Sequence, residues 1–407
     1  MMGGISKYRR LPRNVFALSL VAFLNDTSSE IIYPLLPAFL YLTLGGASPA
    51  LLGIIEGFAE SVAALLKLFS GYLSDRFRVR KLPVFLGYLL ASLSRPFLFF
   101  ANTWTQILAI RVTDRIGKGI RGAPRDAMLA ASVEPERRGL VFGFNRAADH
   151  MGAVVGPITA SMLLYFFAAN PDKPSSDEYR TVFLFAAIPV ILGLLAVVFL
   201  VKESKAVSRE TAPVRPNLSW KMFDGNFKRY ILIVGLFTLS NSSDAFLLLK
   251  ATDAGVSVAL IPILWMTLHF SKVVFSLIGG ELSDKVGRKP LIISGWLVYA
   301  VVYFGFGQAD AEWQLWSLFI AYGLFFGLTE GAEKALVADL VGEEKRGTAF
   351  GLYNLAYSIG LFPASLLFGL IWYEFGDATA FTTGAALALI AAVAMSSVRI
   401  QRDDSTG

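Results

Sequence analysis

Long apolar stretches separated by short polar loops follow one another along the whole chain. They lie at 14–44, 49–73, 82–101, 104–131, 139–167, 181–202, 228–250, 257–282, 289–309, 313–339, 347–373 and 378–399, which makes twelve. A helix needs about 20 residues to cross the hydrocarbon core of a bilayer, and each stretch is long enough. The pattern therefore predicts an all-α integral membrane protein with twelve transmembrane helices.

Two pairs of segments repeat about half a chain apart. Gly71-Tyr-Leu-Ser-Asp75-Arg76 is followed 209 residues later by Gly280-Glu-Leu-Ser-Asp284-Lys285, and each copy closes an apolar stretch. Arg138-Gly139-Leu-Val-Phe142-Gly143 returns 208 residues on as Arg346-Gly347-Thr-Ala-Phe350-Gly351. Such matches indicate a duplicated unit, and we expect two pseudo-symmetric six-helix bundles, 1–202 and 228–407. Parallel halves with a substrate site between them near the bilayer midplane are typical of secondary transporters.

Two polar segments lie outside the apolar stretches, one between the two bundles and one before the first stretch. Residues 203–227 contain proline and many polar side chains, and we expect them to form a cytoplasmic linker. Its last part, Trp220 to Phe227, fits either a helix at the membrane surface or a flexible tether. The N-terminus is short and basic without a small-residue cleavage site after a brief apolar core, so we expect no removable signal peptide.

Composition supports a place in the bilayer. Of 407 residues, 55% are hydrophobic and only 17% are charged, and the mean hydropathy is +0.57. Ordinary soluble domains are less apolar and carry more charge. The sequence has no cysteine, which excludes a disulfide framework or a thiolate metal site.

The net charge of +6 would also suit a nucleic-acid-binding protein, so the location of the basic residues matters. Most basic loop residues fall on one side of the predicted membrane: Lys7, Arg9, Arg10, Arg13, Arg76, Arg78, Arg80, Lys81, Arg137, Arg138, Lys285, Arg288, Lys289, Lys345 and Arg346. The opposite loops hold mainly acids beside Lys173 and Arg180. By the positive-inside rule we expect both termini in the cytoplasm, a multi-pass location in the inner (plasma) membrane, and no nucleic-acid partner.

The repeated loop motif resembles that of the Major Facilitator Superfamily, and the resemblance covers almost the whole chain. The family motif reads roughly Gly-x-Leu-x-Asp-Arg-x-Gly-Arg-Lys; the copy from Gly280 to Lys289 fits it, with Lys285 for the first arginine. The first copy departs, because Arg78 stands where the loop glycine is expected. The resemblance implies alternating access between the two halves. It also implies a cytoplasmic gate formed by Gly71, Asp75, Arg76, Gly280, Asp284 and Lys285.

The fifth apolar stretch is similar to the antiporter signature of the drug–proton exchangers in that superfamily. Gly143, Gly152, Gly156 and Pro157 match it, while Ala160-Ser161 replaces its closing glycines. The resemblance implies export by exchange for protons. Ordinary helix packing also explains the pattern, since small residues allow close approach and proline bends a helix.

Acidic residues within the first two stretches are candidates for proton coupling. Asp26 and Glu30, preceded by Asn25, share a helix face, as do Glu56 and Glu60 of the second stretch. At 1.5 Å per residue, Asp26 and Glu60 fall roughly 15–18 Å into the membrane. A carboxyl group in a low-dielectric cavity can take up and release a proton near physiological pH. The alternative is that these acids only pair with internal bases as structural locks.

The fourth stretch is unusually basic, with Arg111, Arg115, Lys118 and Arg125 at helical spacing. Each would cost roughly 2.5–3.5 kcal/mol facing lipid at a helix centre, so the stripe must face water or carboxylates. The family resemblance implies a proton-transfer role for Arg111. The run Gly117-Lys118-Gly119 lacks the spacing of a nucleotide-binding loop, which argues against transport driven directly by ATP.

The second half carries a different set of polar groups in its apolar stretches. Asn241, Asp244, His269, Glu330 and Glu333 join Asn25, Glu56, Arg115, Arg146 and His150 as candidate substrate-cavity residues. An imidazole such as that of His269 can relay protons or bind a ligand, although a histidine hydrogen-bonded within a helix interface is equally compatible with the sequence.

Charges of both signs occur within the first six stretches, seven acids against eight bases, which favours a polar cavity and a polar or charged solute. We therefore predict a monomeric, proton-coupled secondary active transporter, without enzymatic activity or cofactor, that exports a small solute by antiport. A proton-driven symporter, a divalent metal or metal-complex transporter and a membrane sensor without transport remain alternatives. Against a metal substrate, the sequence has no His-x-x-x-His or similar ligand spacing.

Overall fold

The computed structural model describes residues 11–43, 48–77, 79–134, 137–203, 220–342 and 345–399. Every regular element in these ranges is a helix. The chain forms two compact units. The N-terminal unit comprises Met1–Phe39, Val62–Arg215 and Val258–Ile263, and the C-terminal unit comprises Leu40–Ser61, Pro216–Ser257 and Leu264–Gly407.

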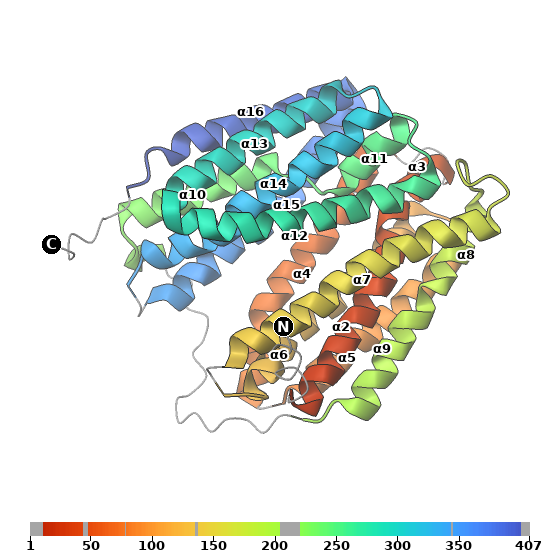
Figure 1. The fold of residues 1–407 in the computed structure, drawn as a ribbon, viewed down its shortest axis with the longest axis horizontal. Helices are drawn as coiled ribbons and strands as arrows, with labels where there is room; N and C mark the ends of the chain where they lie inside the picture. The colour runs from red at the N-terminus through yellow and green to blue at the C-terminus, as the bar shows by residue number, and fades with distance from the viewer. Residues whose placement is uncertain are drawn as a thin grey trace, which may run out of the picture. The chain divides into compact units, whose positions relative to one another are not determined.

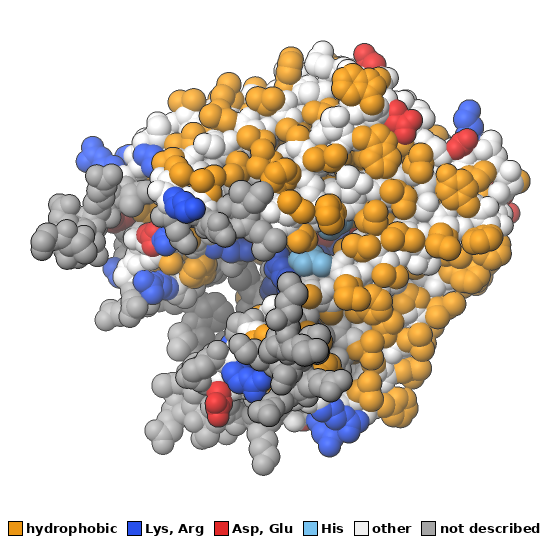
Figure 2. All heavy atoms as spheres, viewed as in Figure 1, with side chains coloured by type: hydrophobic (Ala, Val, Ile, Leu, Met, Phe, Trp, Pro, Cys, Tyr) orange, Lys and Arg blue, Asp and Glu red, His pale blue; other side chains and the backbone are white. Residues whose placement is uncertain are grey.

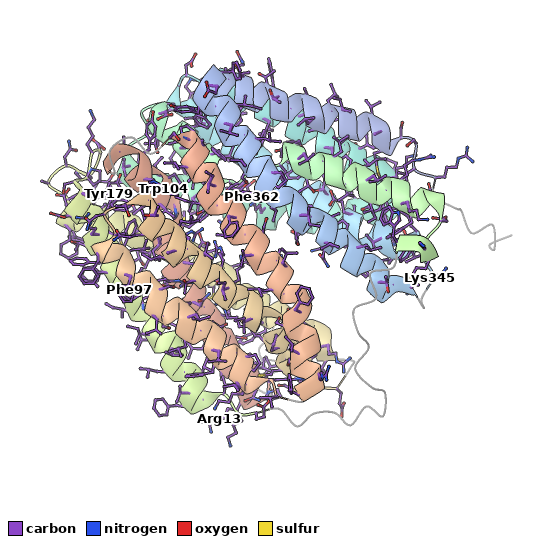
Figure 3. The ribbon with its side chains drawn as sticks, turned by 180° about the vertical axis from the view of Figure 1, so that it is seen from behind. Arg13, Phe97, Trp104, Tyr179, Lys345 and Phe362 are labelled. Atoms are coloured by element: carbon purple, nitrogen blue, oxygen red, sulfur yellow. The ribbon has the colours of Figure 1, made fainter. Side chains whose placement is uncertain are left out.

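The first half of the chain contributes the following helices: α2 (Arg13–Ile32), η1 (Tyr33–Leu35), α3 (Leu36–Thr43), α4 (Pro49–Phe77), α5 (Lys81–Ser94), η2 (Arg95–Phe100), α6 (Trp104–Ala131), α7 (Arg138–Phe167), α8 (Ser176–Phe185) and α9 (Ala187–Leu200). In the N-terminal unit α2 packs against α7 and α9, and α5 packs against α6 (Figure 1). The apolar core of this unit includes Val15, Leu18, Tyr88 and Met128, all fully or almost fully buried. Arg13 lies at one end of the unit, and Trp104 and Tyr179 lie at the other (Figure 3).

Glycines allow α2 and α7 to approach closely. A Cβ atom on Gly152 would lie 2.7 Å from the carbonyl oxygen of Phe23, and one on Gly156 would lie 2.7 Å from that of Thr27. No larger residue fits there without separating the helices. Gly143, on the same helix, has open space beside it, since a Cβ atom there would meet no other atom within 4 Å.

The second half contributes η4 (Trp220–Met222), α10 (Gly225–Ser240), α11 (Ala245–Asp253), η5 (Val258–Leu260), α12 (Ile261–Val286), α13 (Arg288–Gln308), α14 (Glu312–Asp339), α15 (Arg346–Phe375) and α16 (Asp377–Met395). In the C-terminal unit α13 packs against α14 and α16, and α10 packs against α15 and α16. Its core is strongly aromatic: Phe237 stacks on Trp296 with ring centres 4.4 Å apart, and Tyr299 stacks on Tyr303 at 4.1 Å.

Eleven helical segments in the described ranges are long and apolar enough to cross a membrane. The twelfth, α6, has the necessary length of 28 residues but carries many charged side chains. Figure 2 shows largely apolar side chains over the visible face, with many of the visible charged side chains toward the edges of the view. The prediction of an all-α, twelve-helix membrane fold is confirmed.

Several predicted spans are not uninterrupted α-helices: the third ends in η2 and the sixth is divided between α8 and α9, and the first and seventh also break. The first is interrupted by η1, which contains Pro34, and the seventh is broken between α10 and α11 at Asn241 to Ser243. Proline lacks an amide hydrogen, and asparagine and serine side chains compete for backbone hydrogen bonds, so both sequences disrupt the regular ladder. At the breaks in the first and seventh spans, polar side chains lie close to backbone groups that are not part of a regular helix.

The predicted linker falls mostly outside the described residues, which resume at Trp220 with the short helix η4. The next helix, α10, begins at Gly225, and the side chain of Asp224 caps it by accepting a 2.8 Å hydrogen bond from the amide of Phe227. The domain boundaries stay a prediction.

Candidate functional site

Asp114 of α6 is the centre of a buried charged cluster in the N-terminal unit. Its carboxylate accepts a 3.0 Å hydrogen bond from Nε of Arg95 and lies 3.4 Å from Nη1 of Arg115. Asp114 and Arg95 are each only 3% exposed. Arg95 occupies this position because α5 changes to the 3-10 turn η2 at Arg95-Pro96, where proline removes a helical hydrogen bond.

Asn25 of α2 connects this cluster to an acid. Its backbone oxygen accepts a 2.9 Å hydrogen bond from Arg95, and its side-chain oxygen accepts bonds from Arg95 at 3.2 Å and Arg121 at 3.3 Å. Its side-chain amide donates to Asp26 at 3.0 Å. Arg121 also donates to the carbonyl of Gly87 and lies over the ring of Tyr88. A single asparagine therefore contacts two arginines and one carboxylate.

Asp26 also lies at the contact between α2 and α7, since its Cβ would be 2.9 Å from a Cβ on Gly152. One turn earlier on α7, Asp149 accepts a 3.3 Å hydrogen bond from Asn145 and lies 3.8 Å from Nη1 of Arg125. The N-terminal unit thus contains acids from α2, α6 and α7 beside arginines from η2 and α6. Such an arrangement can hold exchangeable protons or bind a polar solute.

Arg111 and Glu30 lie in the same unit. Arg111 is 4% exposed, and its guanidinium is 5.5 Å from the ring centre of Tyr33. Glu30 lies on the face of α2 that meets Gly156 of α7. Their sequence-predicted roles in proton coupling stay predictions.

In the C-terminal unit, polar groups gather around the break between α10 and α11. Asp244 lies 3.4 Å from the ammonium of Lys272 on α12 and accepts a 3.0 Å hydrogen bond from the hydroxyl of Tyr322 on α14. Asn241 donates to the hydroxyl of Tyr357 on α15 at 3.2 Å. The broken span therefore contacts three neighbouring helices through polar side chains.

Glu333 of α14 is more deeply buried than Asp244, with 4% of its surface exposed. Its carboxylate accepts hydrogen bonds from Nε1 of Trp296 at 2.9 Å and from the hydroxyl of Tyr353 at 2.7 Å. Glu330, one turn earlier, is much more exposed and pairs with Lys334 at 3.1 Å. The two predicted cavity acids of α14 consequently have different surroundings.

The other candidate cavity residues are spread over several helices. On α4, Glu56 is 1% exposed and Glu60 is half-buried. On α7, Arg146 is exposed and His150 is half-buried. On α12, the rings of His269 and Trp265 are nearly perpendicular, with centres 4.8 Å apart. Among the described residues, no group of three His, Asp or Glu side chains is placed to hold a metal ion.

The predicted gate residues lie near the ends of α4 and α12. Gly71 lies within α4 with a Cβ position 3.2 Å from Ala123 of α6, and the side chains of Arg76 and Lys285 are exposed. The side chains of Asp75 and Asp284, and the surroundings of Gly280, fall outside what the structure describes.

The sequence-predicted site residues did not include Arg95, Asp114, Arg121, Asp149 or Lys272, which have prominent roles in these clusters. Each is a charged residue within an apolar stretch, which is the signal that could have selected them. Their pairing depends on which helices are neighbours, and sequence spacing does not give that information.

Comparison with known proteins identifies the family. The Major Facilitator Superfamily model matches residues 18–266 and 231–406. The chain is 36% identical over 388 residues to an uncharacterized MFS-type transporter of Methanocaldococcus jannaschii, covering 94% of each chain. It is 25% identical over 334 residues to the multidrug resistance protein MdtH of Salmonella paratyphi C, covering 81% of this chain and 79% of that protein.

Solved structures agree in fold. The nucleoside transporter NupG, as a point mutant, superposes with a TM-score of 0.80 at 13% identity, covering 94% of this chain and 99% of that one. A D-xylose-proton symporter gives 0.73 at 17% identity, covering 95% and 97%. The fold is that of a multi-pass membrane transporter, and the chain belongs to the Major Facilitator Superfamily. The sequence-based prediction of the family is confirmed.

Proposed function

We propose that this transporter is a proton-coupled exporter that exchanges a small polar or charged solute for protons. The observation that carries the proposal is the buried cluster of the N-terminal unit, where Asn25 links the carboxylate of Asp26 to Arg95 and Arg121. Carboxylates held beside bases within membrane-spanning helices are suited to exchange protons during a transport cycle.

The direction is supported by relatives and by helix packing. MdtH is a multidrug resistance protein by name, and its similarity favours efflux. The close contact of Gly152 and Gly156 with α2 is consistent with the exchanger-like signature of α7. In this proposal the bundles 1–202 and 228–407 alternate in access, the linker 203–227 lies in the cytoplasm, and the protein acts as a monomer in the inner membrane.

Transport in everted membrane vesicles tests the proposal. In these vesicles the former cytoplasmic face is outside, so an imposed proton gradient, acidic inside, should drive solute into the lumen. We expect Asp26→Asn or Glu60→Gln to remove gradient-driven accumulation while the protein remains folded, because an amide cannot release a proton at neutral pH. Asp177→Asn, at an exposed position in the first turn of α8, is the control and should transport normally.

The same assay separates the alternatives. Gradient-driven loss of solute from preloaded everted vesicles would indicate symport in the import direction. Undiminished coupling in both single variants and in the double variant would remove these two acids from the mechanism.

A further inference from the structure

The C-terminal unit contains two lysine–aspartate pairs that differ in geometry. Lys250 of α11 and Asp377 of α16 are 2.5 Å apart, and the lysine side chain is 8% exposed. Lys272 of α12 and Asp244 are 3.4 Å apart, and their side chains are 20% and 19% exposed. The first pair is tight and largely enclosed on the lysine side. The second has a longer separation, and its lysine side chain is more exposed than that of Lys250.

The surroundings of Lys272 explain how a charged group persists in an apolar helix. Its ammonium lies 3.7 Å from the ring centre of Phe326 and 5.6 Å from that of Trp265, so two aromatic faces supplement the single carboxylate. A strong charge-assisted hydrogen bond is about 2.7–2.9 Å long, and the 3.4 Å separation from Asp244 exceeds that. An ammonium has three donors. Among the described residues, Asp244 is the one recorded oxygen partner of this ammonium.

Asp244 is better satisfied than its partner. Its second oxygen accepts a 3.0 Å hydrogen bond from Tyr322, which fixes the carboxylate at the break between α10 and α11. A cationic solute would have to displace Lys272, which is covalently tethered beside the acid and therefore competes strongly. An anionic solute need not displace Asp244, because the ammonium has three donors and Asp244 accepts from one of them. The geometry therefore favours a negative ligand.

We propose that Lys272 binds the anionic group of the transported solute, and that the solute is an organic anion with a carboxylate or phosphate group. The aromatic side chains beside the ammonium favour an anion carried on an aromatic body. This inference rests on the proposed transport function and specifies its substrate class. Lys272 is a substrate-binding residue in this scheme, and Asp244 is a positioning residue that holds the ammonium in place.

Binding to the purified protein in detergent tests the inference. Isothermal titration with three probes of matched size compares naphthoate, neutral naphthamide and cationic naphthylmethylammonium. We expect naphthoate to bind at least about tenfold more tightly than the other two. Lys272→Met should abolish this preference and Lys272→Arg should retain it, since arginine also donates to carboxylates.

Controls separate binding from folding. Lys250→Met removes the other paired lysine of the same unit and should leave the naphthoate preference unchanged. The Lys272→Met variant leaves the Asp244 carboxylate without its cation and could unfold for that reason. The double variant Lys272→Met/Asp244→Asn removes both charges, and it should also bind naphthoate without preference. Thermal unfolding monitors each variant.

The inference is overturned if naphthoate binds no better than the amide or the amine, or if the preference survives in the lysine-to-methionine variant. Binding in detergent requires no proton gradient. If naphthoate binding depends on Lys272 but a proton gradient drives no transport, the proposed coupling mechanism is wrong and the proposed substrate class stands.

Discussion

Asp114 illustrates how a charged residue is accommodated in this protein. It is 3% exposed and lies beside Arg95 and Arg115, so its charge is balanced by ion pairs and not by water. Removing one partner of a buried ion pair leaves the other partner uncompensated, which is more costly than losing both. The apolar neighbours on α5 and α6 offer no substitute.

We therefore expect Asp114→Asn to destabilise the protein by about 3–5 kcal/mol, because two buried arginines lose their carboxylate. Thermal unfolding in detergent measures the effect. Asp126→Asn, on the same helix but 41% exposed on its side chain, should change the melting temperature little. Equal effects of the two substitutions would contradict the structural role of the buried cluster.

For individual residues, the sequence was sufficient to select many polar groups within apolar stretches. Asn25, Asp26, Arg111, Asp244 and Glu333 were chosen in that way, and the structure shows buried or half-buried contacts for each. The sequence could not show that Asn25 contacts Arg95 and Arg121, because those residues lie 70 and 96 positions away. Neighbouring helices decide such contacts.

Among the helices, the close packing of α2 on α7 depends on two glycines one turn apart. The Cβ positions of Gly152 and Gly156 meet backbone atoms of α2, whereas that of Gly143 meets nothing. Backbone atoms cannot rotate away as a flexible side chain can. Helices in membranes associate through such contacts between small residues, because lipid provides no hydrophobic driving force.

Gly156→Ala should consequently separate α2 from α7 and lower the melting temperature, while Gly143→Ala should be neutral or slightly stabilising. Alanine favours helix over glycine by roughly 1 kcal/mol, so the two variants on one helix should shift stability in opposite directions. Thermal unfolding of both variants in the same detergent is the measurement. A higher melting temperature for Gly156→Ala would show that the interface between α2 and α7 can accept a methyl group, contrary to the distances at Gly156.

Across the entire chain, the repeat found in the sequence is visible in corresponding contacts within each unit. Arg80 donates to the carbonyl of Ala127, and Arg288, 208 residues later, donates to that of Ala335, both at 3.2 Å. Gln106 accepts from the amide of Thr103 at the start of α6, and Gln314 accepts from that of Ala311 at the start of α14. The two units therefore share local construction.

Their interiors differ at corresponding positions. With the same offset of 208 residues, Arg95 corresponds to Tyr303, Asp114 to Tyr322 and Arg125 to Glu333. In the second unit tyrosines stand in place of the ion-paired side chains of the first, and the rings of Tyr303 and Tyr322 have centres 6.0 Å apart and are tilted by 46°. A shared fold thus carries two different sets of chemical groups.

The proposed orientation, with both termini in the cytoplasm, can be tested by labelling introduced cysteines. The chain contains no cysteine, so each introduced cysteine is the one labelling site. Arg13→Cys and Lys345→Cys should react with a membrane-impermeant maleimide only in everted vesicles, and Lys173→Cys and Glu374→Cys should react in intact cells. This follows from the excess of basic residues expected on the cytoplasmic side. Labelling of Arg13→Cys in intact cells would reverse the orientation.

Apolar length and local motifs are properties of consecutive residues, so the membrane-spanning helices, the internal repeat and the family could all be predicted from the sequence. The pairing of charges could not. Arg95 reaches Asp114 and Asn25, and Lys272 reaches Asp244, because helix packing brings distant positions together. Each charged side chain in the apolar interior needs a partner of opposite charge or a hydrogen-bonding partner. The sequence contains several possible partners for each one, and the packing of the helices decides which of them is in contact.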